Sequence, residues 1–114
     1  MAACIFCDIA AKRISARIAG ETDDLVAFHD TNPQAPTHVL IIPKRHVAGA
    51  ADLAMTDAEL TGRMVLFAAD LARTLGIDHS GYRLVINNGP GAGQTVSHIH
   101  LHLLGGRPFH WPPG

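Results

Sequence analysis

The stretch from 96 to 104 reads VSHIHLHLL, and no other segment constrains the fold as strongly. Three histidines, His98, His100 and His102, alternate there with apolar residues. Alternate residues of a strand project from the same face. The pattern therefore predicts a strand over 96–104 with a buried apolar face and a row of three imidazoles on the other face.

The rest of the chain predicts an antiparallel sheet with one long helix. Apolar runs at 17–20, 25–28, 38–42 and 82–87 predict four further strands. A helix over 56–75 follows from apolar residues at helical spacing, with Thr56 and Glu59 as a capping box and Gly76 as the stop. Residues 5–11 fit a short helix. We expect an α+β fold, in which a five-stranded antiparallel sheet carries the long helix across one face.

Length and charge exclude several classes of protein. The 114 residues are expected to form a single domain, 1–114. A net charge of −1 with scattered basic residues argues against nucleic acid as a partner, and no apolar run approaches a membrane span of roughly 20 residues. The first residues lack the early basic region of a secretory signal, and two cysteines give no disulfide framework. We expect a soluble, cytoplasmic protein.

The histidine row allows a metal site, a catalytic site or a solvated strand face. Neighbouring rings on one strand lie about 6.5–7 Å apart, so three in a straight row cannot readily share one zinc ion. A metal held by one of them, with ligands from elsewhere, stays open. The loop 89–95, with Gln94 and Thr95, and Asn87 before it, offers hydrogen-bond donors for phosphate oxygens. An imidazole beside a bound phosphate can attack phosphorus, and His100 is the central ring.

The residues also resemble the histidine-triad (HIT) superfamily, whose signature alternates three histidines with apolar residues as in 98–104. Its Hint branch, the histidine-triad nucleotide-binding proteins, is similar over nearly the whole chain. The matching segments are CIF at 4–6, FHD at 28–30, PQAPTH at 33–38, IPK at 42–44, GYR at 81–83, GQT at 93–95 and the tail GGR…HWPPG at 105–114.

The resemblance implies a purine nucleoside phosphoramidase, which hydrolyses the P–N bond of AMP–amine conjugates through a nucleotidyl-histidine and needs no cofactor for the chemistry. AMP, GMP and their phosphoramidates are the implied ligands. The catalytic positions of the family fall on His100 as nucleophile, with His38, His98 and His102. Nucleotide contacts fall on Asp30 and Thr31 for the ribose side, and on Asn87, Gly93, Gln94, Thr95, His100 and His102 for the phosphate side.

The pair Cys4-Ile5-Phe6-Cys7 allows a redox pair, a zinc site or two reduced, packed cysteines. Only three residues precede it, whereas a thioredoxin-like pair should follow a strand. Zinc is therefore the better functional interpretation, with histidines as the missing ligands. Some histidine-triad proteins that keep this pair bind structural zinc, and the resemblance places the other ligands on His46 and His98.

The resemblance further implies a homodimer in which the sheet continues across two subunits. Two other functions stay open. One is a dinucleoside polyphosphate hydrolase of the same superfamily, with the same nucleophile and a different leaving group. The other is a nucleotide-binding interaction module whose turnover is incidental.

Overall fold

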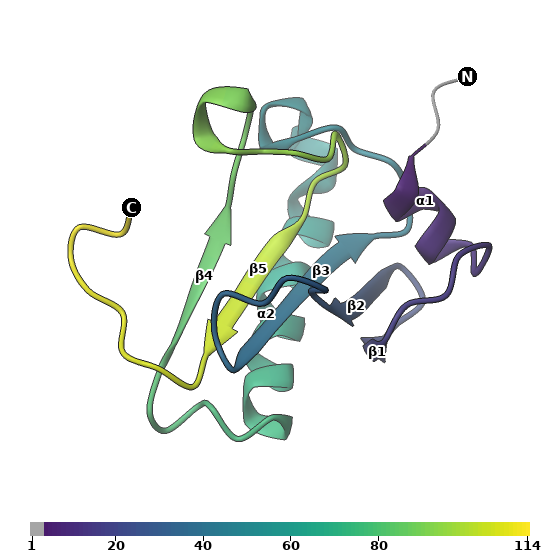
Figure 1. Ribbon diagram of the computed structural model, residues 1–114. Coiled ribbons are helices and arrows are strands. Elements are labelled where there is room, and N and C mark those ends of the chain that lie inside the picture. Colours follow the sequence, from purple (N-terminus) through teal and green to yellow (C-terminus); the bar gives the residue numbers. More distant parts are fainter. Residues whose placement is uncertain (1–3) are drawn as a thin grey trace.

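The computed structural model describes residues 4–114 and forms a five-stranded sheet with a helix on each face (Figure 1). The first three residues of the predicted domain 1–114 lie outside the described residues. In chain order the helices and strands are α1 (Ile5–Ala10), β1 (Ile18–Glu21), β2 (Leu25–His29), β3 (Thr37–Pro43), α2 (Ala58–Thr74), β4 (Tyr82–Ile86) and β5 (Leu101–Gly105).

The sheet is antiparallel throughout, with the strand order β1-β2-β3-β5-β4. This confirms the predicted fold, and the four strands expected before the histidine row differ by at most one residue at either end. Strand β3 lies at the centre, and it pairs with β5 so that Leu40 is opposite His102 and Val39 is opposite Leu103. The histidine row is therefore joined directly to the most buried strand.

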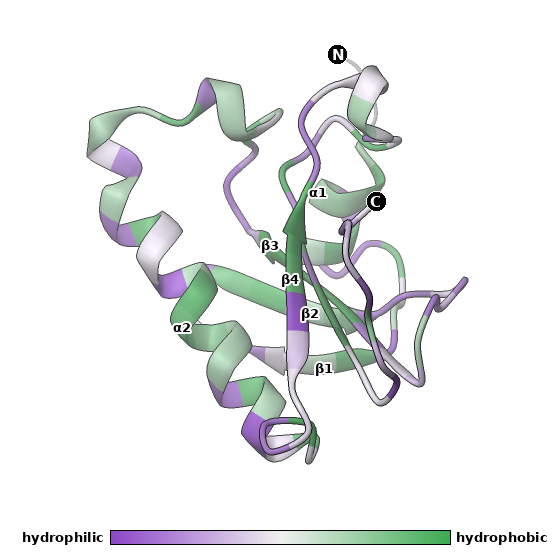
Figure 2. Ribbon diagram, turned by 90° about the vertical axis from the view of Figure 1, so that its left-hand side faces the viewer, coloured by the Kyte–Doolittle hydropathy of each residue, from purple (hydrophilic) through white to green (hydrophobic). Residues whose placement is uncertain are grey.

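Helix α2 covers one face of the sheet because its apolar residues recur at helical spacing. Met64 is 1% exposed, and it packs with Leu60 and Leu71 against Ile41 of β3 and Leu103 of β5. Figure 2 views the sheet from its β4 edge, with α2 running along one side. The predicted glycine stop is also confirmed, because Gly76 follows the helix with a φ of 76°.

The other face of the sheet is covered by α1. Phe6 and Ile9 are buried there against a second apolar cluster, which includes Phe28 of β2 and Leu40 of β3. Side chains alternate along β5, so Leu101 and Leu103 join the α2 side while His102 points to the α1 side. The histidine row and the short N-terminal helix thus share one face.

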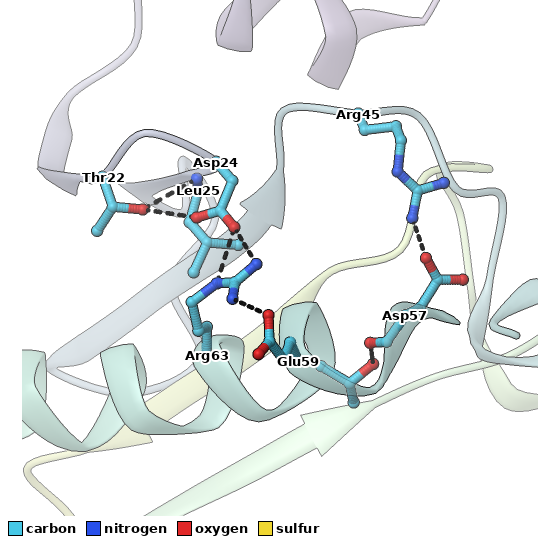
Figure 3. A network of polar contacts seen from close by, with 8 residues as sticks. Thr22, Asp24, Leu25, Arg45, Asp57, Glu59 and Arg63 are labelled. Carbon is cyan, nitrogen blue, oxygen red and sulfur yellow. Dashed lines mark hydrogen bonds and ion pairs between the residues drawn. The ribbon is translucent and has the colours of Figure 1, made fainter. Parts of the chain in front are cut away.

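The predicted capping box at the start of the long helix is wrong. Thr56 lies in a 3-10 turn, Met55–Asp57, and Asp57 instead accepts a hydrogen bond from the Ala54 amide at 2.9 Å. Glu59 pairs with Arg63 one helical turn later at 3.2 Å. Arg63 also pairs with Asp24 in the β1–β2 turn at 2.7 Å, so this network ties the helix start to the sheet (Figure 3).

The last strand begins later than the sequence predicts. Strand β5 starts at Leu101, so residues 96–100 are irregular and the predicted strand over 96–104 is only half right. The Ile99 amide donates to the Val47 carbonyl at 2.6 Å, a bond to a loop and not to a neighbouring strand. His98 and His100 therefore project from an irregular segment next to the sheet. Within residues 4–114 no helix is long and apolar enough to cross a membrane.

The C-terminal tail packs back on the rest of the chain as far as His110. The guanidinium groups of Arg83 and Arg107 stack on the Phe109 ring, at 5.0 and 4.3 Å from its centre. Arg83 also donates to the His110 carbonyl at 3.0 Å. Trp111 beyond this anchor is 85% exposed.

Candidate functional site

The His100 ring is oriented by a hydrogen bond from one of its nitrogens, which leaves the lone pair of the other nitrogen free. Its Nδ1 lies 2.8 Å from the His98 carbonyl, which can only accept, so Nδ1 carries the proton. In the neutral ring Nε2 then keeps its lone pair. The side chain is 6% exposed, and the Phe6 ring packs edge-on against it with centroids 5.1 Å apart. His100 is therefore pre-oriented as a nitrogen nucleophile.

His38 and His102 form a hydrogen-bonded pair whose proton positions follow from the backbone. The Gln34 amide donates to His38 Nδ1 at 3.0 Å, so the proton of His38 sits on Nε2. That Nε2 lies 2.9 Å from His102 Nδ1 and donates to it. The proton of His102 therefore sits on Nε2, which is buried and has no hydrogen-bond partner within residues 4–114.

Burial keeps both rings of this pair neutral. Desolvation lowers the pKa of His102 to about 4, and the neighbouring His100 and His38 add to the shift. Desolvation also lowers the pKa of His38, against the opposing effect of the Asp30 carboxylate. A neutral His102 with its proton on Nε2 is an unpaired donor beside His100, whose ring centroid is 5.0 Å away. A buried donor without a partner is costly, so a ligand acceptor is the natural partner.

His100 and His102 line a cavity of about 740 Å³ on the α1 face of the sheet. Thr95, Asp30 and Thr31 are among its other polar lining residues. The apolar walls come from α1, from β2 and β3 and from the segments beside them, namely Ile5, Phe6, Ile9, Ile14, Phe28, Leu40 and Val96. A largely apolar cavity with a small number of polar groups is typical of a small-molecule site.

Asp30 stands beside the histidine pair with a half-buried carboxylate. One oxygen accepts from the Asn32 amide at 2.8 Å, and the other lies 3.5 Å from His38 Nε2. The carboxylate thus borders the cavity and can accept further hydrogen bonds there. A carboxylate suits the hydroxyls of a sugar and would repel a phosphate.

The loop before the histidines is shaped by Gln94, whose whole carboxamide is used within the protein. Its oxygen accepts from the Gly89 amide at 2.7 Å, and its nitrogen donates to the carbonyls of Ala48 at 2.8 Å and Val96 at 3.0 Å. Of the predicted phosphate residues in and before this loop, Thr95 lines the cavity, whereas Asn87, Gly93 and Gln94 do not. Gln94 therefore organises the loop, and Thr95 presents its hydroxyl.

The four predicted metal ligands meet at the N-terminal end of α1. The ligand atoms of Cys4, Cys7, His46 and His98 all lie within 4.8 Å of one another. His98 Nδ1 is 3.4 Å from Cys4 Sγ, 3.5 Å from Cys7 Sγ and 3.2 Å from His46 Nδ1, and Cys7 Sγ is 3.3 Å from His46 Nδ1. A tetrahedral zinc site has S···N edges of about 3.5–3.6 Å and N···N edges of about 3.3–3.4 Å. The donor set fits zinc in both chemistry and size.

His98 is also in the right protonation state to bind a metal. Its Nε2 donates to the Pro43 carbonyl at 2.8 Å, which leaves Nδ1 with its lone pair toward the cysteines. Desolvation lowers the pKa of His98, so the ring stays neutral. Desolvation also raises the pKa of the Cys7 thiol above its ordinary value, so a metal bound there would displace a proton.

A second cluster of potential ligands, Asp30, His38 and His102, does not fit a metal. The Gln34 amide places the proton of His38 on Nε2, the atom that would have to coordinate. That proton is already shared with His102 Nδ1. The cluster is therefore a hydrogen-bond relay.

Two parts of the site are absent from the sequence prediction. Helix α1 supplies an apolar wall of the cavity, for which the apolar residues Ile5, Phe6 and Ile9 were the available signal. His29, left without a role, lines the cavity with Arg17. His38, which the resemblance places among the catalytic positions, is hydrogen-bonded to His102.

Comparison with known proteins identifies the family. The HIT domain model matches residues 11–109. A HIT family hydrolase from Legionella pneumophila superposes with a TM-score of 0.96 at 50% identity, covering 98% of this chain and 100% of that one. A 14 kDa zinc-binding protein of Zea mays is 46% identical over 112 residues, which are 96% of this chain and 87% of the relative. A histidine triad nucleotide-binding protein from Candida albicans superposes with a TM-score of 0.83 at 32% identity, covering 96% and 83%. The chain therefore belongs to the HIT-domain family.

Proposed function

We propose that the protein is a nucleotidyl hydrolase that cleaves the P–N bond of purine nucleoside 5′-phosphoramidates through His100. The observation that carries this proposal is the pairing of two neighbouring rings with opposite roles. His100 offers a lone pair on Nε2, and His102, which lines the same cavity, carries an N–H with no acceptor within residues 4–114. A nucleophile beside a donor suits attack on a phosphorus whose oxygens gain negative charge.

The reaction proceeds in two displacements. His100 Nε2 attacks phosphorus, the Nε2–P bond forms, and the P–N bond to the amine breaks as the amine nitrogen takes a proton from solvent. Water then attacks the nucleotidyl-histidine, a P–O bond forms, the Nε2–P bond breaks and the water's proton returns to solvent, which releases the nucleoside monophosphate. His102 Nε2–H donates to a phosphoryl oxygen, and Thr95 also lines the cavity.

The ligand class follows from the rest of the cavity. Asp30 suits the ribose hydroxyls, and the apolar walls suit the faces of a purine ring. The similarity to a hydrolase and to a nucleotide-binding protein of the same family supports this assignment. AMP, GMP and their amine conjugates are therefore the proposed ligands.

Zinc is the proposed occupant of the site formed by Cys4, Cys7, His46 and His98. Four protein ligands close the coordination sphere, as in structural zinc sites. The maize relative described as zinc-binding supports this choice. Zinc at this site supplies structural cross-linking, and the chemistry at His100 needs no cofactor.

A homodimer is proposed to form through α2 and β4. Strand β4 is an edge of the sheet, and Ile86 at its end is 38% exposed. Val65 of α2 is 44% exposed, and Figure 2 views the molecule from the β4 edge. An edge strand together with exposed apolar residues favours pairing with a second copy.

The test is turnover of an AMP–amine phosphoramidate by the wild type, His100→Ala and His79→Ala. His79 is fully exposed and far from the row in sequence, so it provides a matched histidine control. We expect AMP release by the wild type and His79→Ala, and a loss of at least 10³-fold in His100→Ala, since the nucleophile is removed. Mass spectrometry of the acid-sensitive intermediate should place one nucleotidyl group on His100.

Other outcomes separate the alternatives. Release of a mononucleotide from a dinucleoside polyphosphate, with the phosphoramidate left intact, would favour the dinucleotide hydrolase. Tight AMP binding without turnover of either substrate would favour an interaction module.

A further inference from the structure

Helix α1 belongs to two sites at once, the metal cluster and the wall of the cavity. Cys4 caps its start and Cys7 lies in its first turn, while Ile5, Phe6 and Ile9 line the cavity. The two sets of side chains leave the same helix on different sides. A bond that holds Cys4 and Cys7 in place therefore also holds the cavity wall that a nucleotide would contact.

A helix of six residues does not hold its shape by its own hydrogen bonds, because helix nucleation is unfavourable in water. Two kinds of contact hold α1 in place. Phe6 and Ile9 are each 6% exposed and pack on the sheet. The other contact is the cluster itself, where Cys4 Sγ accepts from the Cys7 amide at 3.4 Å and lies 3.4 Å from His98 Nδ1.

A second connection runs from the cluster to the nucleophile through His98. Its Nδ1 faces the cysteines and its Nε2 donates to the Pro43 carbonyl. Its backbone carbonyl accepts a hydrogen bond from His100 Nδ1–H. The Phe6 ring spans the same region, with centroids 5.9 Å from His98 and 5.1 Å from His100. The cluster and the cavity therefore share a helix, a ring and a peptide group.

We propose that metal binding at this cluster and nucleotide binding in the cavity are thermodynamically coupled, with α1 as the shared element. Zinc cross-links α1 to the His46 loop and to His98, and so holds the wall formed by Ile5 and Phe6 in its nucleotide-binding position. Without the metal, nucleotide binding must also order that wall, and the free energy needed for this lowers the nucleotide affinity. This inference rests on the proposed nucleotide site, and it assigns that site a metal-dependent affinity.

The coupling must be reciprocal, because both ligands act on one equilibrium. Zinc should lower the Kd for AMP by on the order of tenfold, within the usual range of roughly 5–150-fold for coupled sites. AMP should lower the Kd for zinc by the same factor. Calorimetry measures AMP binding to the zinc-loaded and zinc-free protein, and chelator competition measures zinc binding with and without AMP.

Two cavity variants separate the wall from a general loss of contacts. Ile5→Ala alters the part of the wall that the cluster holds, so we expect it to weaken AMP binding mainly in the zinc-loaded protein and to reduce the coupling factor. Val96→Ala alters a part of the cavity wall that α1 does not itself supply, so AMP binding should weaken equally in both forms. Circular dichroism of each form shows whether the zinc-free chain is folded, and the reciprocal zinc measurement starts from the loaded wild type.

Each result decides the matter. Equal AMP affinities with and without zinc overturn the coupling while leaving the nucleotide site intact. Absence of zinc uptake overturns the metal assignment and the coupling together. If no form binds AMP, the proposed function itself fails. An Ile5→Ala variant that couples like Val96→Ala excludes α1 as the shared element.

Discussion

Acid should destabilise the protein through His102 well before its carboxylates are protonated. Burial lowers the pKa of His102 to about 4 in the folded protein, against about 6.5 in an unfolded chain. Between these values the unfolded chain binds more protons, so lowering the pH favours unfolding. The cost begins near pH 6.5 and is complete below about pH 4, where it reaches about 3 kcal/mol. At pH 5 the loss is about 2 kcal/mol relative to pH 7.

Urea unfolding of the wild type and His102→Gln at pH 7 and pH 5 measures this contribution. Glutamine does not titrate, and its oxygen can accept the bond from His38 Nε2. The pKa values of His38 and His98 are also lowered by burial, and these residues are present in both proteins, as is the metal cluster. The wild type should therefore lose about 2 kcal/mol more than the variant between the two pH values. Equal losses would refute the assignment of His102 as a buried, neutral ring.

Three further predictions concern α2 and the face of the sheet that it covers. Met64→Ala should cost about 2–5 kcal/mol of unfolding free energy because the side chain is 1% exposed. Met55→Ala, at 91% exposure, should change the unfolding free energy by less than about 0.5 kcal/mol. Similar losses for both variants in denaturant unfolding would contradict the core assignment. Gly62→Ala should stabilise α2 by about 0.5–1 kcal/mol, since a Cβ there meets nothing within 4 Å. Gly105→Ala should destabilise, since its Cβ would lie 2.5 Å from Ile77 Cδ1 and 3.0 Å from Ile77 Cβ, and an unchanged melting temperature would show that this contact is not tight.

Local pattern alone predicted the elements whose signals lie within a few residues. The alternation at Val39, Leu101 and Leu103 and the helical spacing of Leu60 and Met64 report which side chains face a core, because burial follows the periodicity of each element. The four first strands and the long helix were therefore predictable to within about two residues. The cysteine pair likewise indicated a metal, and the resemblance supplied the two histidines that meet it.

Hydrogen bonds over long sequence distances decided the rest. The bounds of a strand depend on its partners. Ile99 bonds to Val47, a loop residue 52 positions earlier, and β5 therefore begins only at Leu101. The start of α2 is an exception, because there a bond only three residues long, from the Ala54 amide to Asp57, replaces the predicted cap at Thr56.

Proton positions at the site are the clearest case of a tertiary decision. The sequence by itself determined that three imidazoles stand in one segment and alternate there with apolar side chains that face the core. Only the fold brought the Gln34 amide to His38, and His38 to His102, 64 residues away. Only the fold placed the His98 carbonyl against the His100 Nδ1. Tautomers follow from such partners, because an imidazole nitrogen donates or accepts according to the group that faces it.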